Sequence, residues 1–173
     1  GQHCKVFISE MRKAAREVGN DIKIGVVVYQ SNDKNFDAVK DWNKGVMSEA
    51  ASIADFLIPH KYFGNKNETN ANVILNTATP GIKQVQEMLN TELKTHANLD
   101  PMPLAFTEYN FWAQGQMQQI SHIGGMHAVL VTGNLISNGI GAGNRWDFMN
   151  GWKEGDSMGL FADQDPGIPR YTP

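Results

Sequence analysis

The chain has 173 residues, of which 41% are hydrophobic and 19% are charged, and this balance excludes a disordered protein. Such a length can form one domain with a buried core. The formal net charge is -3 and no basic run occurs, so we expect no nucleic acid among the partners. No apolar run reaches the roughly 18 residues of a membrane-spanning helix, so we expect no membrane span. The chain begins Gly-Gln-His-Cys-Lys without an initiator methionine, and we expect a piece of a longer polypeptide.

The first third of the chain alternates between helical and strand patterns. A helix is predicted over residues 3–18, because apolar residues recur on one of its faces. These residues are Phe7, Met11, Ala14, Ala15 and Val18. A strand is predicted over residues 22–29, apolar on both faces at its end as in a covered parallel sheet. A polar loop, a second helix at 37–53 and a second strand at 54–60 follow.

The same alternation continues in the rest of the chain. An Asn-rich segment at 64–72 indicates a loop, and Thr79-Pro80 is a good start for a helix that ends near Leu99. Ile82, Val85, Leu89 and Leu93 form the apolar face of that helix. A short buried strand is predicted at 104–106, an apolar helix at 116–137 and a final strand at 145–150.

This order of elements predicts right-handed βαβ units and a parallel sheet, hence an α/β fold. An open doubly wound sheet usually carries a glycine-rich phosphate loop between strand and helix, whereas Gly139–Gly143 follows a helix and precedes a strand. A (β/α)8 TIM barrel uses roughly 31 residues per unit. We therefore expect residues 1–173 to form the C-terminal half of such a barrel, about strands 5 to 8. Residues 151–173 are expected to be a loop-rich exit toward a missing C-terminal region.

Polar and aromatic residues gather where all four predicted strands end, which in parallel α/β folds is where ligands bind. They are Tyr29 and Gln30; His60 and Tyr62; Glu108, Tyr109 and Asn110; and Trp146, Asp147 and Asn150. Glu108 is flanked by residues that can form hydrogen bonds and stack, which favours a sugar site. An ordinary glutamate in a polar loop remains open as an alternative.

Glycosidic bonds are usually cut by two carboxylates. Glu108 is the best single candidate, and Asp147 and Asp156 are weaker. No second glutamate lies at a strand end, so this chain does not supply a complete pair. Trp146 is either a platform for a sugar ring or a core residue, and His60 is either a hydrogen-bonding group of the site or a structural histidine.

The histidine, aspartate and cysteine residues of the sequence do not form a recognisable metal-binding or nucleophile motif. His122 and His127 miss the i, i+4 spacing of a metal pair, and packing explains them better than zinc. Asp163-Gln164-Asp165 favours a solvated loop over a calcium site. Cys4 is the only cysteine, so no disulfide can form within the chain. We expect neither a metal nor a cofactor.

The run Thr107-Glu108-Tyr109-Asn110 resembles the seventh strand of retaining glycoside hydrolases with a (β/α)8 barrel, a clan that includes arabinofuranosidase-like, xylosidase-like and agarase-like enzymes. The segment from Arg145 to Trp152 and the segments 155–161 and 166–173 are similar to secreted bacterial agarase-like members. The resemblance covers nearly the whole chain as strands 5 to 8.

The resemblance implies that Glu108 is the nucleophile and that Trp146 lines the subsite beside it. His60 or Tyr62 would contact the nucleophile, and Tyr109 and Asn110 would orient the sugar. The clan's acid/base glutamate follows the fourth strand, which would precede Gly1 and is absent here. The expected partners are a polysaccharide or oligosaccharide substrate and the remaining half of the barrel, from the same chain or another copy. The expected location is extracellular or periplasmic. The alternative is a non-catalytic extracellular structural or carbohydrate-binding protein that reuses a barrel fragment.

Overall fold

The computed structural model describes residues 1–30, 41–112, 118–151, 158–163 and 169–171. It is an α/β structure that divides into two compact units. The first unit combines Gly1–His60 with Val85–Ala105, and the second combines Lys61–Gln84 with Phe106–Pro173.

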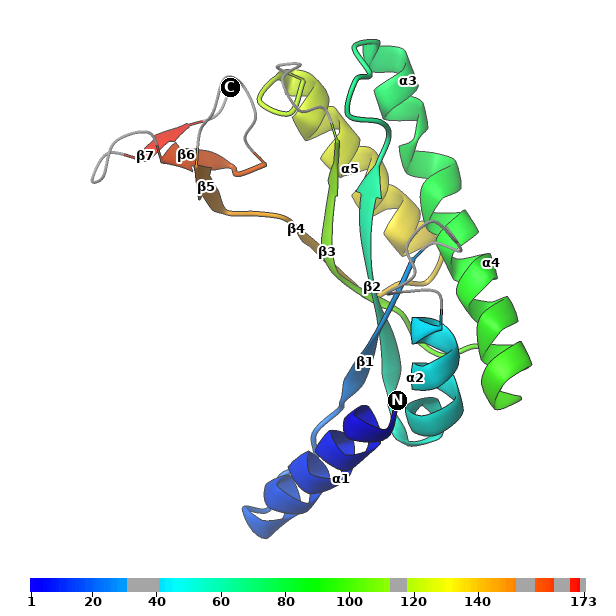
Figure 1. The fold of residues 1–173 in the computed structure, drawn as a ribbon. Coiled ribbons are helices and arrows are strands. Elements are labelled where there is room, and N and C mark those ends of the chain that lie inside the picture. Colours follow the sequence, from blue (N-terminus) through cyan, green and yellow to red (C-terminus); the bar gives the residue numbers. More distant parts are fainter. Residues whose placement is uncertain (31–40, 113–117, 152–157, 164–168, 172–173) are drawn as a thin grey trace. The chain divides into compact units, whose positions relative to one another are not determined.

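Helices and strands alternate along most of the chain (Figure 1). In chain order, the elements are α1 (Gln2–Glu17), β1 (Gly25–Val28), α2 (Trp42–Ala50), the 3-10 helix η1 (Ala51–Ile53), β2 (Phe56–Phe63), α3 (Ala71–Asn76), α4 (Ala78–Ala97), β3 (Ala105–Phe111), α5 (His122–Ser137), β4 (Ala142–Arg145), β5 (Met149–Gly151), β6 (Phe161–Asp163) and β7 (Pro169–Tyr171). Strands β1 to β4 form a sheet in sequential order, and β5 to β7 form a second, three-stranded sheet.

The larger sheet has the parallel pairing that the alternating pattern predicts. β1 pairs with β2 in parallel, from Gly25 opposite Phe56 to Val28 opposite Pro59. A parallel bridge between Leu57 and Leu104 continues the pairing toward β3. Each crossover between consecutive strands contains a helix, as parallel neighbours require. The predicted α/β class with a parallel sheet is confirmed.

The first helix forms where it is predicted, but a different face is buried. Ile8 is buried, whereas Phe7 and Met11 are 68% and 51% exposed. Neighbouring positions on a helix point about 100° apart, so the row containing Ile8 faces inward when the row containing Phe7 faces out. The prediction that the row containing Phe7 and Met11 is the buried face of this helix was therefore wrong. The packing of α1 against α2, where Val46 and Met47 are buried, decides the orientation.

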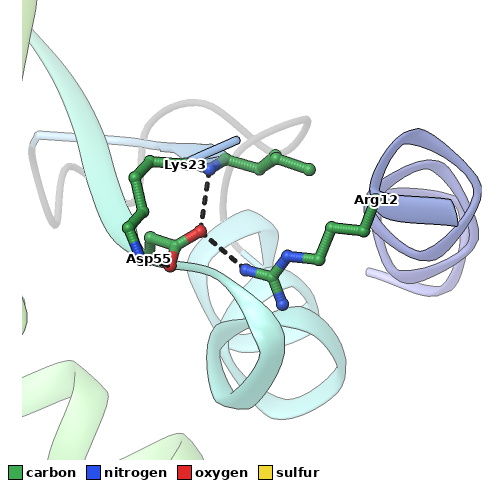
Figure 2. A network of polar contacts seen from close by, with 4 residues as sticks. Arg12, Lys23 and Asp55 are labelled. Carbon is green, nitrogen blue, oxygen red and sulfur yellow. Dashed lines mark hydrogen bonds and ion pairs between the residues drawn. The ribbon is translucent and has the colours of Figure 1, made fainter. Parts of the chain in front are cut away.

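Asp55, just before β2, contacts α1 and the segment that precedes β1 in the first unit, and Figure 2 shows the contacts of its carboxylate. It accepts hydrogen bonds from the backbone N–H of Ile24 at 2.8 Å and from Arg12 of α1 at 2.6 Å. Lys23 donates to the other oxygen at 3.3 Å. The backbone N–H of Ile24 and the two cations hold the pKa of Asp55 below its ordinary value, against the opposing effect of burial.

The predictions for the middle of the chain are confirmed in one helix and wrong in the segment before it. Ile82, Val85, Leu89 and Leu93, the predicted apolar face of α4, are all buried. The segment predicted as a loop already contains the start of α3, because the Asn70 side chain accepts a hydrogen bond from the N–H of Asn72 at 3.0 Å and caps that helix. Asparagine here begins a helix instead of marking a loop.

The strand boundaries differ most from the sequence prediction. β2 continues to Phe63 and β3 to Phe111, so residues expected after these strands lie within them. The predicted strand at 145–150 is two strands, since β4 ends at Arg145 and β5 begins at Met149. The expected loop-rich exit contains β6 and β7. Parts of the predicted helices at 37–53 and 116–137 lie outside the described residues.

Candidate active site

The alternation of side chains along β3 divides its residues between two faces. The hydroxyl of Tyr109 lies 3.2 Å from Thr132 Oγ1 of α5, and the ring of Phe111 lies 4.9 Å from that of His127 on the same helix. Tyr109 and Phe111 therefore face α5. Successive side chains of a strand point in opposite directions, so Glu108 and Asn110 belong to the other face. Tyr109, a predicted site residue, is 4% exposed and is not brought to the side of Glu108.

The neighbouring strand β2 brings a tyrosine to Glu108. The ring of Phe63 packs closely against Gly81 of α4, where an added Cβ would lie only 2.6 Å from the ring. Phe63 therefore points toward the helices. Tyr62, one residue earlier, points the other way, and its hydroxyl donates a hydrogen bond to Glu108 Oε1. Burial raises the pKa of Tyr62, and the hydrogen bond to Glu108 and the negative charges of Glu108 and Asp147 raise it further. The phenol therefore keeps its proton and remains a donor to the carboxylate.

The ring of Tyr62 is supported by Trp112, which follows β3. The two ring centroids are 5.0 Å apart, with the planes tilted by 32°. The backbone N–H of Trp112 donates to the carbonyl of Phe63 at 2.8 Å, and the Lys66 ammonium lies 5.3 Å from the Trp112 ring. These contacts hold the segment after β3 against the end of β2. Trp112 was predicted only as part of the stacking surface around Glu108, and its contact with Tyr62 is not indicated by any local pattern.

The backbone of Trp146 is bound to β3 at Tyr109 and Asn110, the two residues that follow Glu108. Its backbone N–H donates to the carbonyl of Tyr109 at 2.8 Å, and its own carbonyl accepts a hydrogen bond from the side chain of Asn110. The Asn110 amide also donates to the carbonyl of Met158 at 3.2 Å. Asn110 is 1% exposed and Trp146 is 43% exposed. The asparagine thus fixes a backbone turn from which a large part of the indole remains accessible.

Asp147 is a second carboxylate near Glu108. Its pKa is raised first by burial and also by the negative charge of Glu108, while its own N–H and the positive charge of Arg145 act in the opposite direction. Its Oδ1 atom is buried and has no hydrogen-bond partner among the residues that the structure describes. The Trp146–Asp147 peptide bond is cis. Asp147 was the weaker sequence candidate, and its proximity to Glu108 and Tyr62 comes from the fold.

The remaining candidates at strand ends lie as follows. His60 is half-buried on β2, two residues before Tyr62 and therefore on the same face of that strand. The backbone N–H and carbonyl of Tyr29 are bound by the buried side chain of Asn43, at 2.6 and 2.8 Å, which fixes the end of β1. Asp156 lies outside the described residues.

The two histidines of α5 have different environments. His122 is exposed at the first residue of the helix, whereas His127 is 1% exposed and packs between the rings of Phe63 and Phe111. Within the described ranges, no group of three or more histidine, cysteine, aspartate or glutamate residues could hold a metal ion. Among the same residues, no helix has the length and apolar character needed to cross a bilayer.

No known protein family and no curated protein sequence matches this chain. Solved structures do match it. The family 51 α-L-arabinofuranosidase of Bifidobacterium longum aligns over 97% of this chain with 12% identity and a TM-score of 0.58. The GH51 arabinofuranosidase of Xanthomonas axonopodis pv. citri aligns over 93% with 13% identity and a TM-score of 0.56. The α-L-arabinofuranosidase of Thermotoga maritima, solved with arabinose, aligns over 94% with 20% identity and a TM-score of 0.55.

These similarities define the class of fold. The chain has a glycoside-hydrolase-like fold and forms part of a (β/α)8 barrel, which confirms the predicted barrel fragment. It spans only about a third of the matched proteins, between 31% and 37% of their length. At these identities the likeness extends to the fold alone.

Proposed function

We propose that this chain is part of a retaining glycoside hydrolase that cleaves a polysaccharide or oligosaccharide, with Glu108 as the nucleophile. The observation that carries the proposal is the hydrogen bond from Tyr62 to Glu108, on the face of the sheet opposite the helices. A carboxylate oriented by a phenol, next to an accessible indole, suits attack on a sugar carbon better than a role in packing. The glycoside-hydrolase-like fold supports the same conclusion.

The proposed reaction is a double displacement. A carboxylate oxygen of Glu108 attacks the anomeric carbon as the bond to the leaving oxygen breaks, and a covalent glycosyl-enzyme forms. A glutamate outside this chain protonates the leaving oxygen and then takes a proton from water, which hydrolyses the intermediate and releases Glu108. Tyr62 orients the Glu108 carboxylate through its hydrogen bond, so the oxygen that attacks is held in place.

The other side chains have supporting roles in this proposal. Trp146 offers its exposed indole to a sugar ring, and Asn110 holds the backbone on which Trp146 sits. His60, on the same face of β2 as Tyr62, is assigned a hydrogen bond to a sugar hydroxyl. Tyr109 faces α5, so we assign it an indirect role, supporting the strand that carries Glu108.

The proposal extends to what completes the site and where the protein works. The remaining barrel strands and the acid/base glutamate come from the same polypeptide or from another copy, and the enzyme acts outside the cytoplasm, in the periplasm or the extracellular space. The intact mass of the native protein, measured under denaturing conditions, distinguishes the first two sources. A mass near that of the 173 residues would require a second copy to complete the barrel.

The decisive experiment uses the whole native protein and a panel of neutral polysaccharides that includes agarose and arabinan. The Glu108→Gln variant should lose turnover and retain binding, because the amide keeps the shape of the carboxylate without its nucleophilicity. The Tyr62→Phe variant should lower kcat by about 10- to 100-fold, the range for a hydrogen bond to a charged group. Glu10→Gln, on the exposed surface of α1, is the matched control and should behave as the wild type. Full activity in Glu108→Gln would refute the assignment, and binding without hydrolysis in the wild type would favour a carbohydrate-binding protein.

A further inference from the structure

The outward side of α5 is largely apolar. The helix has 16 residues and contains no aspartate, glutamate, lysine or arginine. Its inner side buries Ile123, Val131 and Leu135, whereas Val129 and Ile136 on the outer side are 72% and 71% exposed. A helix at a protein surface normally turns polar residues outward, and a helix that is apolar on all sides is buried within a larger structure. The described residues supply no cover for the outer side of α5.

The two most exposed residues of this side belong to one row along the helix. Gly125, Val129, Thr132 and Ile136 follow the i, i+4, i+7, i+11 spacing of a single helical face, and all four are exposed. The Thr132 hydroxyl lies 3.2 Å from the hydroxyl of Tyr109 on β3. The row therefore runs along the edge of α5 that borders the sheet, where a neighbouring helix of the same layer would contact it.

Strand β4, next to this row, is also uncovered. It is the last strand in the order of the larger sheet, and Ala142, Gly143 and Asn144 are exposed, whereas most residues of β3 are buried. Leu135 of α5 packs directly against Gly143 without space for a Cβ there, and the ring of Tyr109 lies beside the same glycine. The row on α5 and the strand thus adjoin. We call them together the α5–β4 face, which consists of Gly125, Val129, Thr132, Ile136 and 142–144.

We propose that the α5–β4 face packs against one helix, the helix that follows β4 in the (β/α)8 barrel, supplied by a part of the same polypeptide outside these 173 residues. In such a barrel each strand is followed by a helix of the outer ring. A helix follows β1, β2 and β3, whereas the described elements after β4 are the strands β5 to β7. The aligned region makes up only 31% to 37% of each matched arabinofuranosidase, so most of each of those polypeptides lies outside it.

The shape of the face indicates what the partner helix presents. Helices pack with the ridges of one in the grooves of the other. Bulky apolar side chains of the partner therefore lie opposite Gly125 and Thr132, and small ones lie opposite Val129 and Ile136. The inference goes beyond the proposed function, because it holds whatever the role of Glu108.

Thiol labelling of the whole native protein tests whether the face is covered. Val129→Cys and Ile136→Cys are each made with Cys4 replaced by serine, and maleimide modification at the new thiol is followed by peptide mass spectrometry. We expect both thiols to react about 100-fold more slowly than a control thiol, because a covered side chain reacts only when the structure opens locally. The control is Gln84→Cys, at an exposed position of α4. Labelling of both α5 thiols as fast as the control overturns the proposal.

Dilution and mass identify the occupant. Cover by the same polypeptide requires protection that is unchanged on dilution and an intact mass well above that of the 173 residues. Protection that disappears on dilution, or a mass near that of the 173 residues, assigns the face to a second copy and overturns the proposal. Ile136→Ala provides a second measurement, since its urea midpoint should fall if the face is covered and match the wild type if it is exposed. None of these readouts uses turnover, so the proposed function is judged separately by Glu108→Gln.

Discussion

The protonation of His127 gives a quantitative prediction that does not depend on the substrate. The imidazole lies between Phe63 and Phe111, with ring centroids 5.0 and 4.9 Å away, and its Nε2 is 3.1 Å from the hydroxyl oxygen of Thr77. The Thr77 hydroxyl donates its hydrogen to the carbonyl of Ile74 at 2.6 Å. The oxygen of Thr77 is thus left to accept from His127, which fixes a neutral ring with its proton on Nε2.

The size of the effect follows from the pKa of His127. Burial, assisted by the positive charge of Arg145, lowers this pKa from the ordinary 6.5 to about 4. Between these two values the unfolded chain binds a proton that the folded chain does not. The free energy of unfolding therefore falls as the pH drops from 6.5 to about 4, and at one pKa unit per roughly 1.4 kcal/mol the loss is about 3 kcal/mol.

The assay is urea unfolding at a series of pH values between 7 and 4, comparing the wild type with His127→Gln. The glutamine does not titrate, so the variant should be spared the loss of about 3 kcal/mol, while the carboxylates contribute equally to both proteins and cancel in the comparison. His122→Gln, exposed on the same helix, is the control and should follow the wild type. Parallel pH dependences for the wild type and His127→Gln would refute the assignment of a neutral buried histidine.

The remaining predictions concern stability and use the same urea assay. Asp55→Asn should lose about 1 to 3 kcal/mol at pH 7, because it weakens the bond to Arg12. The pKa of Asp55 is lowered, so this difference should shrink as the pH falls below the ordinary carboxyl range, and a difference that persists in acid would contradict the ionic origin. Gly81→Ala should cost about 1 to 3 kcal/mol, because its Cβ would lie 2.6 Å from the buried ring of Phe63. At Gly133 an added Cβ would meet no described atom within 4 Å, so Gly133→Ala should raise the free energy of unfolding by up to about 1 kcal/mol through helix propensity. Equal changes in stability for Gly81→Ala and Gly133→Ala would show that packing against Phe63 does not determine the effect.

The sequence by itself determined the class of fold. Periods of apolar residues are local, and they correctly predicted the alternation of helices and strands and the buried face of α4, with Ile82 and Leu89 at its centre. They also predicted Glu108 just after the third strand, whereas in the structure it lies within β3. The same reasoning failed for α1, where two apolar rows compete and only the contact with α2 decides that Ile8 is buried.

Only the tertiary structure decided which side chains of the site meet. Tyr62 and Tyr109 are chemically alike, and both were predicted to lie near Glu108. Once β2 and β3 extend through these residues, strand alternation turns Tyr62 toward Glu108 and Tyr109 toward α5. Strand ends are set by hydrogen bonds to neighbouring strands, which residue spacing along one segment does not encode. For the same reason a local pattern could not have predicted that the backbone of Trp146 pairs with Tyr109 of β3, which brings Asp147 within the electrostatic influence of Glu108.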